Sequence, residues 1–238
     1  MAVVEQIQEA MRAVATSERA KAGQWFFKTG VGQYGEGDKF LGVTVPQQRK
    51  IAKQFYKTLS LEAMEQMLKS PWHEERLTAL FMLVLTYQKG DEFKKAQVAN
   101  LYLANTKRVN NWDLVDSSAG YILGPWLEGS PYKIQTLTKL ALSKNLWERR
   151  IAILATSYYI GRGSADEALQ IIEILKHDKH DLIQKAVGWM LREIGKRVDE
   201  KVLKKFLDEN VASLPRTTLR YAIERLPEAK RKHYLSLK

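Results

Sequence analysis

The stretch "RRIAIL", residues 149–154, recurs in altered form at three other places in the chain, and this recurrence decides the fold. Each copy places a basic residue second and apolar or small residues behind it: "ERLTAL" (75–80), "RRIAIL" (149–154), "QKAVGW" (184–189) and "LRYAIE" (219–224). The basic residues of the last three copies are 35 positions apart, and the first step is 74, which is twice 37. A unit of 35–37 residues holds two antiparallel helices with their turns, so the sequence predicts a stack of such pairs.

Helical periodicity fills the rest of the chain. Apolar residues at three- and four-residue steps predict helices in four stretches: 3–15, 46–57, 61–69 and 165–178. Helix starts are indicated at Ser60, Ser164 and Pro215, and the six prolines fall at segment edges. Sustained two-residue alternation is absent, so no sheet is expected. We expect an all-α solenoid of HEAT-like antiparallel helix pairs, curved around a concave basic groove, as a single domain over residues 1–238. A compact helical bundle is the alternative.

Composition excludes several classes of protein. The 238 residues are 45% hydrophobic and 27% charged, an ordinary balance for a globular chain. The absence of cysteine excludes disulfides, cysteine–zinc sites and thiol nucleophiles, and it fits a reducing compartment. The first residues lack the pattern of a signal peptide, and no stretch approaches the roughly 18 apolar residues of a membrane span. We therefore expect a soluble, cytoplasmic protein without a membrane segment.

The net charge of +11 is distributed unevenly. Residues 1–138 hold 17 Lys and Arg against 14 Asp and Glu, whereas residues 139–238 hold 21 against 13. A basic half indicates a polyanionic partner, most often nucleic acid. The alternative is that these charges are solvated helix faces on a basic protein.

A fifth copy of the repeat would centre on residue 113, inside "NNWDLVDSSAGYILG" (110–124). Counted from the basic position of each unit, four unusual residues occupy places −1, +3, 0 and +4, which form one helical face: Trp112, Asp116, Arg150 and Trp189. We expect this face of successive repeats to line the groove. The alternative is that both tryptophans belong to the core and that Asp116 and Arg150 form a structural ion pair.

Several other motifs carry little chemistry. "GVGQYGEG" (30–37) matches G-x-G-x-x-G but follows a helical stretch instead of a strand, so a flexible loop is expected. His177 and His180 have no third ligand nearby, so we expect a polar turn entering a helix and no metal site. His73 falls at a helix start, where the sequence indicates no partner for it. No cofactor is expected.

Four long stretches resemble the AlkD-type DNA alkylation repair family: "NNWDLVDSSAGYILG", "LWERRIAIL", "HDLIQKAVGWMLREIGKR" and "PRTTLRYAIERL". The resemblance runs from about residue 20 to 227. It implies a stack of HEAT-like helical pairs and the removal of N3- and N7-alkylated purines, which are cationic bases. It also implies that the damaged base need not be extruded into a pocket.

The same resemblance assigns roles to residues. It places the lesion-side tryptophan and aspartate at Trp112 and Asp116, the arginine on the lesion backbone at Arg150, and the second tryptophan at Trp189. Some members have a tyrosine where the best match is Phe26, so a hydroxyl contact to DNA is lost if that equivalence holds. Repeat positions and the basic half add further expected backbone contacts: Arg149, Lys185, Arg192 and Arg220.

These observations together predict a monofunctional DNA-alkylpurine glycosylase of base excision repair. The expected partner is double-stranded DNA that contains alkylated bases, bound by a monomer without a small-molecule cofactor. A non-catalytic nucleic-acid-binding module and a protein–protein scaffold are the alternatives. The carboxylate of Asp116 discriminates against a pure binder, because a carboxylate in a DNA groove repels phosphate.

Overall fold

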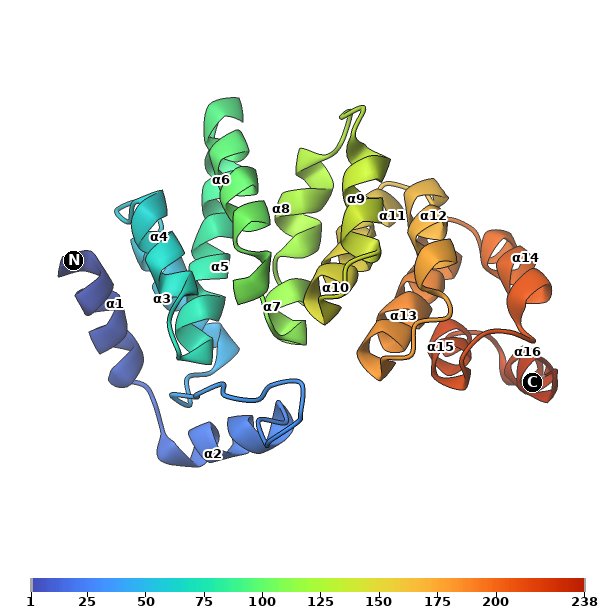
Figure 1. Ribbon diagram of the computed structural model, residues 1–238, viewed down its shortest axis with the longest axis horizontal. Helices are drawn as coiled ribbons and strands as arrows, with labels where there is room; N and C mark the ends of the chain where they lie inside the picture. The colour runs from blue at the N-terminus through green and yellow to red at the C-terminus, as the bar shows by residue number, and fades with distance from the viewer. Residues whose placement is uncertain (1, 238) are drawn as a thin grey trace. The chain divides into compact units, whose positions relative to one another are not determined.

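The computed structural model describes residues 2–237, and over that range it contains helices and no strand (Figure 1). The predicted all-α class is confirmed. The chain divides into two compact units, Met1–Ser118 and Ala119–Lys238, which are called unit 1 and unit 2 below. The expectation of a single domain over residues 1–238 stays a prediction.

Unit 1 is built around one long central helix, α5. Its helices are α1 (Ala2–Arg12), α2 (Ser17–Phe26), α3 (Val45–Phe55), α4 (Leu61–Leu68), α5 (His73–Lys89), α6 (Glu92–Ala104), the 3-10 turn η1 (Thr106–Arg108) and α7 (Trp112–Asp116). Helix α5 packs against α3, α4, α6 and α7, and most of its side chains are buried. Because α5 is covered on several sides, polar groups at its N-terminal end need partners inside the protein.

Unit 2 is a succession of helix pairs. Its helices are α8 (Ala119–Trp126), α9 (Lys133–Ala141), α10 (Leu146–Ala155), α11 (Ser157–Ile160), α12 (Asp166–Leu175), α13 (Asp181–Arg197), α14 (Glu200–Asn210), α15 (Arg216–Ala222) and α16 (Glu228–Ser236). Helix α9 packs on α10, and α13 packs on α10, α12, α14 and α15 (Figure 1). The buried residues of α9, α10 and α13 are almost all apolar or small.

The 35-residue period of the sequence is visible in unit 2 as a period of helix starts. Helices α10, α13 and α15 begin at Leu146, Asp181 and Arg216, which are 35 residues apart. Arg149 and Gln184, also 35 apart, each donate a side-chain hydrogen bond to the carbonyl six residues earlier, at 3.1 and 2.9 Å. The repeat is therefore a repeat of local structure as well as of residue types.

Helix boundaries follow the predictions with two differences. Ser60 caps α4 as expected, accepting a hydrogen bond from the backbone N–H of Ala63. Ser164 lies one residue too early to cap α12, because Ala165 is the N-cap and the Ser164 hydroxyl donates to Glu167 instead. Pro125 lies inside α8 and not at a segment edge. It is tolerated there because it is the next-to-last residue, where a missing N–H costs one hydrogen bond.

The glycine-rich segment between α2 and α3 is a folded loop. Gly37 and Gly42 have φ angles of 83° and 84°, a region that side-chain-bearing residues rarely adopt. The buried Glu74 carboxylate accepts hydrogen bonds from the backbone N–H groups of Leu41, Gly42 and Val43 at 2.8–3.3 Å. The start of α5 thus holds the end of this loop in place.

Candidate functional site

Helix α7 carries two of the predicted site residues at its ends. It is a five-residue helix in which Trp112 is the first residue and Asp116 the last, so both side chains lie on one face. Both are half-buried, whereas Leu114 and Val115 between them are fully buried. Five residues are far too few for a helix that is stable alone. The orientation of Trp112 and Asp116 therefore depends on contacts with the rest of unit 1.

Aromatic side chains from α2 and the following loop hold the indole of Trp112. Its ring centroid lies 5.2 Å from that of Phe27 and 5.7 Å from that of Phe26. The indole N–H donates a hydrogen bond of 3.2 Å to the hydroxyl of Tyr34. Phe26 itself has no hydroxyl, but Tyr34 of the glycine-rich loop brings one to Trp112. No sequence pattern indicates this contact, because 78 residues separate the two positions.

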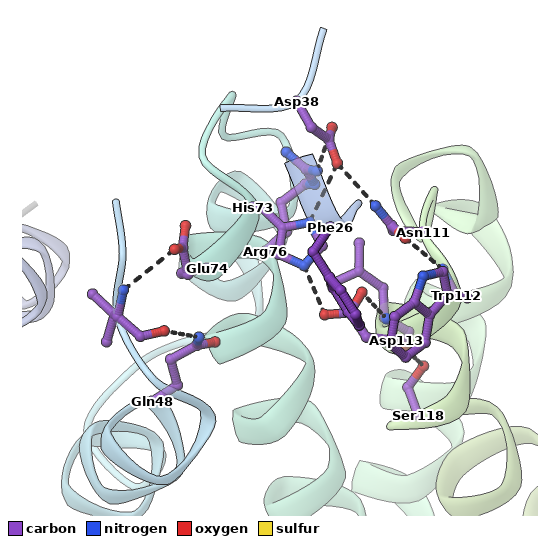
Figure 2. A network of polar contacts seen from close by, with 12 residues as sticks. Phe26, Asp38, Gln48, His73, Glu74, Arg76, Asn111, Trp112, Asp113 and Ser118 are labelled. Atoms are coloured by element: carbon purple, nitrogen blue, oxygen red, sulfur yellow. Dashed lines mark hydrogen bonds and ion pairs between the residues drawn. The ribbon is translucent and has the colours of Figure 1, made fainter. Parts of the chain in front are cut away.

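A group of buried and half-buried polar side chains joins the start of α5 to α7 and to the loop after α2 (Figure 2). His73, the first residue of α5, places Nε2 2.7 Å from Oδ2 of Asp113 and Nδ1 3.2 Å from Oδ2 of Asp38. The expectation that His73 has no partner is wrong. The reason is topological: α5 begins where α7 and the loop after α2 come together, so two carboxylates distant in sequence reach one imidazole.

The same group fixes both neighbours of Trp112. Asn111 caps α7 through a 2.8 Å bond from the Trp112 backbone N–H, and its amide donates to Asp38 at 3.4 Å. Asp113 accepts from the Leu114 backbone N–H at 2.8 Å with the oxygen that does not face His73. We call Asp38, His73, Arg76, Asn111 and Asp113 the anchor cluster.

Charges in the anchor cluster balance. Burial lowers the pKa of His73, but the Asp113 charge and the hydrogen bonds to Asp113 and Asp38 outweigh it and raise that pKa to about 9, with Arg76 opposing. Burial raises the pKa of Asp38, yet His73 and Arg76 hold it below its ordinary value. Arg76 donates to Asp38 at 2.7 Å. Two cations thus face two carboxylates at neutral pH, which is the condition for keeping charge in a protein interior.

Asp116 acts on a buried neighbour in unit 1. Burial raises the pKa of Tyr102, the hydrogen bond with Ser118 lowers it, and the negative charge of Asp116 raises it further. The Tyr102 hydroxyl lies 3.0 Å from the Ser118 hydroxyl, which in turn donates to the Leu114 carbonyl at 2.6 Å. Tyr102 and Ser118 therefore support the C-terminal end of α7, where Asp116 lies.

Arg150, Arg149 and Trp189 lie in unit 2, on α10 and α13. Arg150 is only 5% exposed, and its guanidinium donates to the Leu182 carbonyl at 2.6 Å. Trp189 is half-buried on α13. Arg149 donates to Asp178 at 2.7 Å and to two carbonyls in the turn between α9 and α10, so its guanidinium closes that turn.

The other predicted backbone contacts of unit 2 differ in accessibility. Arg220 is exposed on α15, and Lys185 on α13 is half-exposed, with an ion pair of 2.7 Å to Asp181. Arg192 is mostly buried and forms an ion pair with Glu224. Arg220 and Lys185 are therefore placed to reach a ligand more easily than Arg149 and Arg192.

Large apolar side chains are exposed on α2 and in the turn that follows it. Helix α2 has no buried residue, and it exposes 83% of Trp25 and 55% of Phe26. Val31 in the next turn is 94% exposed. Lys21 and Lys28, both exposed, lie in the same segment. Aromatic side chains interleaved with lysines are typical of surfaces that bind nucleic acid by stacking and charge.

Residues 2–237 contain no group of three or more His, Asp or Glu side chains arranged to hold a metal ion. His180 is the N-cap of α13, where its Nδ1 accepts from the Leu182 backbone N–H at 3.2 Å, as the predicted polar turn requires.

None of the helices in the described part of the chain is long and apolar enough to span a membrane.

The sequence profile of the DNA alkylation repair enzymes matches residues 7–226, which is most of the chain. The chain belongs to the DNA alkylation repair enzyme family. Membership assigns it a role in the repair of alkylated DNA and implies DNA as its partner. No curated protein sequence matches it.

Two solved structures have a fold similar to that of this chain. A predicted DNA alkylation repair enzyme from Enterococcus faecalis has a TM-score of 0.69 and 19% identity, covering 90% of this chain and 97% of its own. AlkD2 from Streptococcus mutans has a TM-score of 0.56 and 19% identity, covering 76% of this chain and 90% of its own. The predicted class of all-α solenoid built from HEAT-like helix pairs is thereby confirmed.

One signal in the sequence pointed to the anchor cluster. Asp113 occupies the place where four other copies of the repeat carry a basic residue: Arg76, Arg150, Lys185 and Arg220. An acidic residue at a position that is otherwise basic indicates a cationic partner, and His73 is that partner. Asp38, Asn111 and Tyr34 had no comparable signal, because they lie outside the repeat pattern.

Proposed function

We propose that this protein is a DNA glycosylase that hydrolyses the N-glycosidic bond of N3- and N7-alkylated purines in duplex DNA. The observation that carries the proposal is the placement of Asp116 and Trp112 on one face of α7, held by the anchor cluster, in a member of a DNA alkylation repair family. We further propose that it acts as a cytoplasmic monomer.

The chemistry of these lesions explains why an aspartate and tryptophans suffice. A purine alkylated at N3 or N7 is cationic, so it leaves as a neutral base when the glycosidic bond breaks. No general acid is needed for that departure. Positive charge passes to the deoxyribose, and water then attacks the sugar. The catalyst must therefore supply negative charge beside the sugar and a group that positions or deprotonates water.

Asp116 is the residue that we assign to both tasks. A carboxylate about 4 Å from a unit positive charge gains roughly 4 kcal/mol at an effective dielectric constant near 20. If that gain is realised mainly in the transition state, it accelerates the reaction on the order of 10³-fold.

The tryptophans extend the same electrostatic logic. An indole face attracts a cation by roughly 0.5–2 kcal/mol, and by more where water is excluded. We propose that Trp112 and Trp189 each offer an indole to the charged lesion and its sugar. Phe27 and Tyr34 prevent the Trp112 ring from rotating away, so its contact with the lesion requires little ordering.

Phosphate contacts would set the register on the duplex. We assign the contact next to the lesion to Arg150, which is only 5% exposed in the structure. Lys185 and Arg220 are proposed as outer contacts, whereas Arg149 and Arg192 act mainly on the structure of unit 2. The exposed Trp25 and Phe26 would stack on nucleotides beside the site.

We propose that the damaged base is not extruded into a protein pocket. Two surface cavities of unit 1, of about 440 and 350 Å³, are lined by residues other than Trp112 and Asp116. An open site of this kind would tolerate bulky adducts that a closed pocket rejects.

A non-catalytic DNA-binding module is the second candidate, favoured by the exposed aromatic and basic side chains of α2. Incubation with duplex DNA containing a single 7-methylguanine separates the two, with the free base measured over time. The glycosylase releases 7-methylguanine and leaves an abasic site. The binding module retains salt-sensitive affinity for the duplex and releases nothing.

A further inference from the structure

We propose that His73 is a positioning residue for catalysis: held between Asp38 and Asp113, its imidazolium fixes α7 so that Trp112 and Asp116 keep the geometry that excision requires. This inference rests on the proposed function for its catalytic consequence. Its structural consequence, the fixed orientation of Trp112, can be measured without any reaction.

The need for such an anchor follows from the size of α7. A helix of five residues makes few internal hydrogen bonds and has little stability of its own. Its buried residues, Leu114 and Val115, determine which face points inward, but apolar packing is not directional. A directional contact at the N-terminal turn is needed to set where Trp112 points.

The anchor cluster supplies two such contacts, one on each side of Trp112. On one side, Asp113 joins His73 at 2.7 Å and the α7 backbone at 2.8 Å with its two carboxylate oxygens. On the other side, Asn111 joins the Trp112 backbone N–H at 2.8 Å. Its amide also reaches Asp38 at 3.4 Å. Both contacts converge on His73, because Asp38 is the second carboxylate that the imidazole meets.

Only a charged imidazole can serve both carboxylates. A neutral histidine has one N–H and one lone pair, so one of its two contacts with a carboxylate would become repulsive. The imidazolium donates from both nitrogens, and Arg76 satisfies the other oxygen of Asp38 at 2.7 Å. The charged groups that face His73 from the elements around it are Asp38, Asp113 and Arg76.

An aromatic contact couples the same residue to Trp112 by a second route. The Phe27 ring centroid lies 4.8 Å from that of His73 and 5.2 Å from that of Trp112. Phe40, nearer the end of the same loop, stacks on His73 with a distance of 4.6 Å between the ring centroids. A shift of the imidazole would therefore displace Phe27 and, through it, the indole.

The test compares His73→Gln and Asp113→Asn with wild type and with Met64→Ala. Met64 is fully buried on α4, a helix that carries no residue of the anchor cluster, so its truncation destabilises unit 1 by another route. All proteins are labelled with 5-fluorotryptophan, and the Trp112 resonance is assigned by its loss in Trp112→Phe. Single-turnover release of 7-methylguanine and affinity for undamaged duplex are measured at a temperature where every variant is folded.

We expect the Trp112 resonance to shift or broaden in His73→Gln and Asp113→Asn, and to stay in place in Met64→Ala. Excision should fall about 10- to 100-fold in the two anchor variants, which is the cost of displacing a reacting group by about 1 Å. Affinity for undamaged duplex should be unchanged. The double variant should lose no more than the worse single variant, because both substitutions break one contact.

An unmoved Trp112 resonance in both anchor variants overturns the proposal, as does wild-type excision by a folded His73→Gln protein. If His73→Gln fails to fold, Asp113→Asn decides the matter by the same readouts. If the wild-type protein releases no base, the proposed function fails, whereas the fluorine resonance still supports or overturns the positioning role.

Discussion

The Nε2 atom of His73 lies 2.7 Å from a carboxylate oxygen of Asp113, although the two residues are 40 positions apart in sequence. This contact joins the first residue of the central helix of unit 1 to the short helix that carries Trp112 and Asp116. The site residues are therefore supported by a buried ion pair as well as by apolar packing.

The stability of the protein should depend on pH through His73. Its pKa is about 9 in the folded protein and 6.5 for an ordinary histidine, so the folded state binds the proton more tightly. Protonated His73 contributes about 3 kcal/mol to the free energy of unfolding. This contribution is fully present below about pH 6.5 and is lost as the pH rises through 9. Urea unfolding from pH 6 to 9.5 measures it. In His73→Gln this part of the slope should vanish, and an unchanged slope would refute the assignment.

Two glycines with nearly the same φ angle should respond differently to alanine. Gly37→Ala meets nothing within 4 Å and pays only for a left-handed backbone, about 1–2 kcal/mol. Gly42→Ala would place its Cβ 2.1 Å from the Thr16 carbonyl oxygen, which adds roughly 1–3 kcal/mol of crowding. Thermal unfolding of the two variants compares them directly. Equal losses would mean that residue 42 does not lie against the Thr16 carbonyl.

Tyr34→Phe removes the hydroxyl that accepts from the Trp112 indole. One hydrogen bond of this kind contributes about 0.5–1.5 kcal/mol, so we expect excision to slow by a few fold to about 10-fold. Single-turnover base release measures the effect. Tyr132→Phe, at a residue 65% exposed in unit 2, is the matched control and should excise like wild type. Identical rates in both variants would exclude a role for the Tyr34 hydroxyl.

Arginines of unit 2 should separate into DNA contacts and structural contacts. Arg220→Ala removes an exposed charge, so the slope of log affinity against log salt should fall by about 0.9 while the melting temperature stays the same. Arg149→Ala leaves the mostly buried Asp178 without its partner, so stability should fall by roughly 3 kcal/mol. Fluorescence anisotropy at several salt concentrations and thermal unfolding give both quantities. A normal salt slope for Arg220→Ala would remove that residue from the DNA surface.

The architecture was predictable from the repeat because each repeat unit is a local stretch of sequence. The helices that start at Leu146, Asp181 and Arg216 have the same 35-residue period as the basic residues. The placement of Trp112 and Asp116 on one face was predictable for the same reason, since four residues make about one turn.

The anchor cluster was not predictable in this way, because its contacts depend on tertiary structure. Asp38 lies in an irregular loop whose path depends on Glu74 and on glycines with positive φ. From the sequence alone no partner could be assigned to His73, whereas in the folded protein it contacts two carboxylates. Charge reversal at Asp113 was the one local sign that a repeat position had acquired a different role.

The most direct measurement is the rate of 7-methylguanine release by Asp116→Asn under single-turnover conditions. The control is Glu92→Gln, the same change of charge at an exposed residue of α6. We predict that Asp116→Asn binds duplex DNA at least as well as wild type and excises on the order of 10³-fold more slowly, whereas Glu92→Gln excises normally. Excision by Asp116→Asn at the wild-type rate would contradict the account.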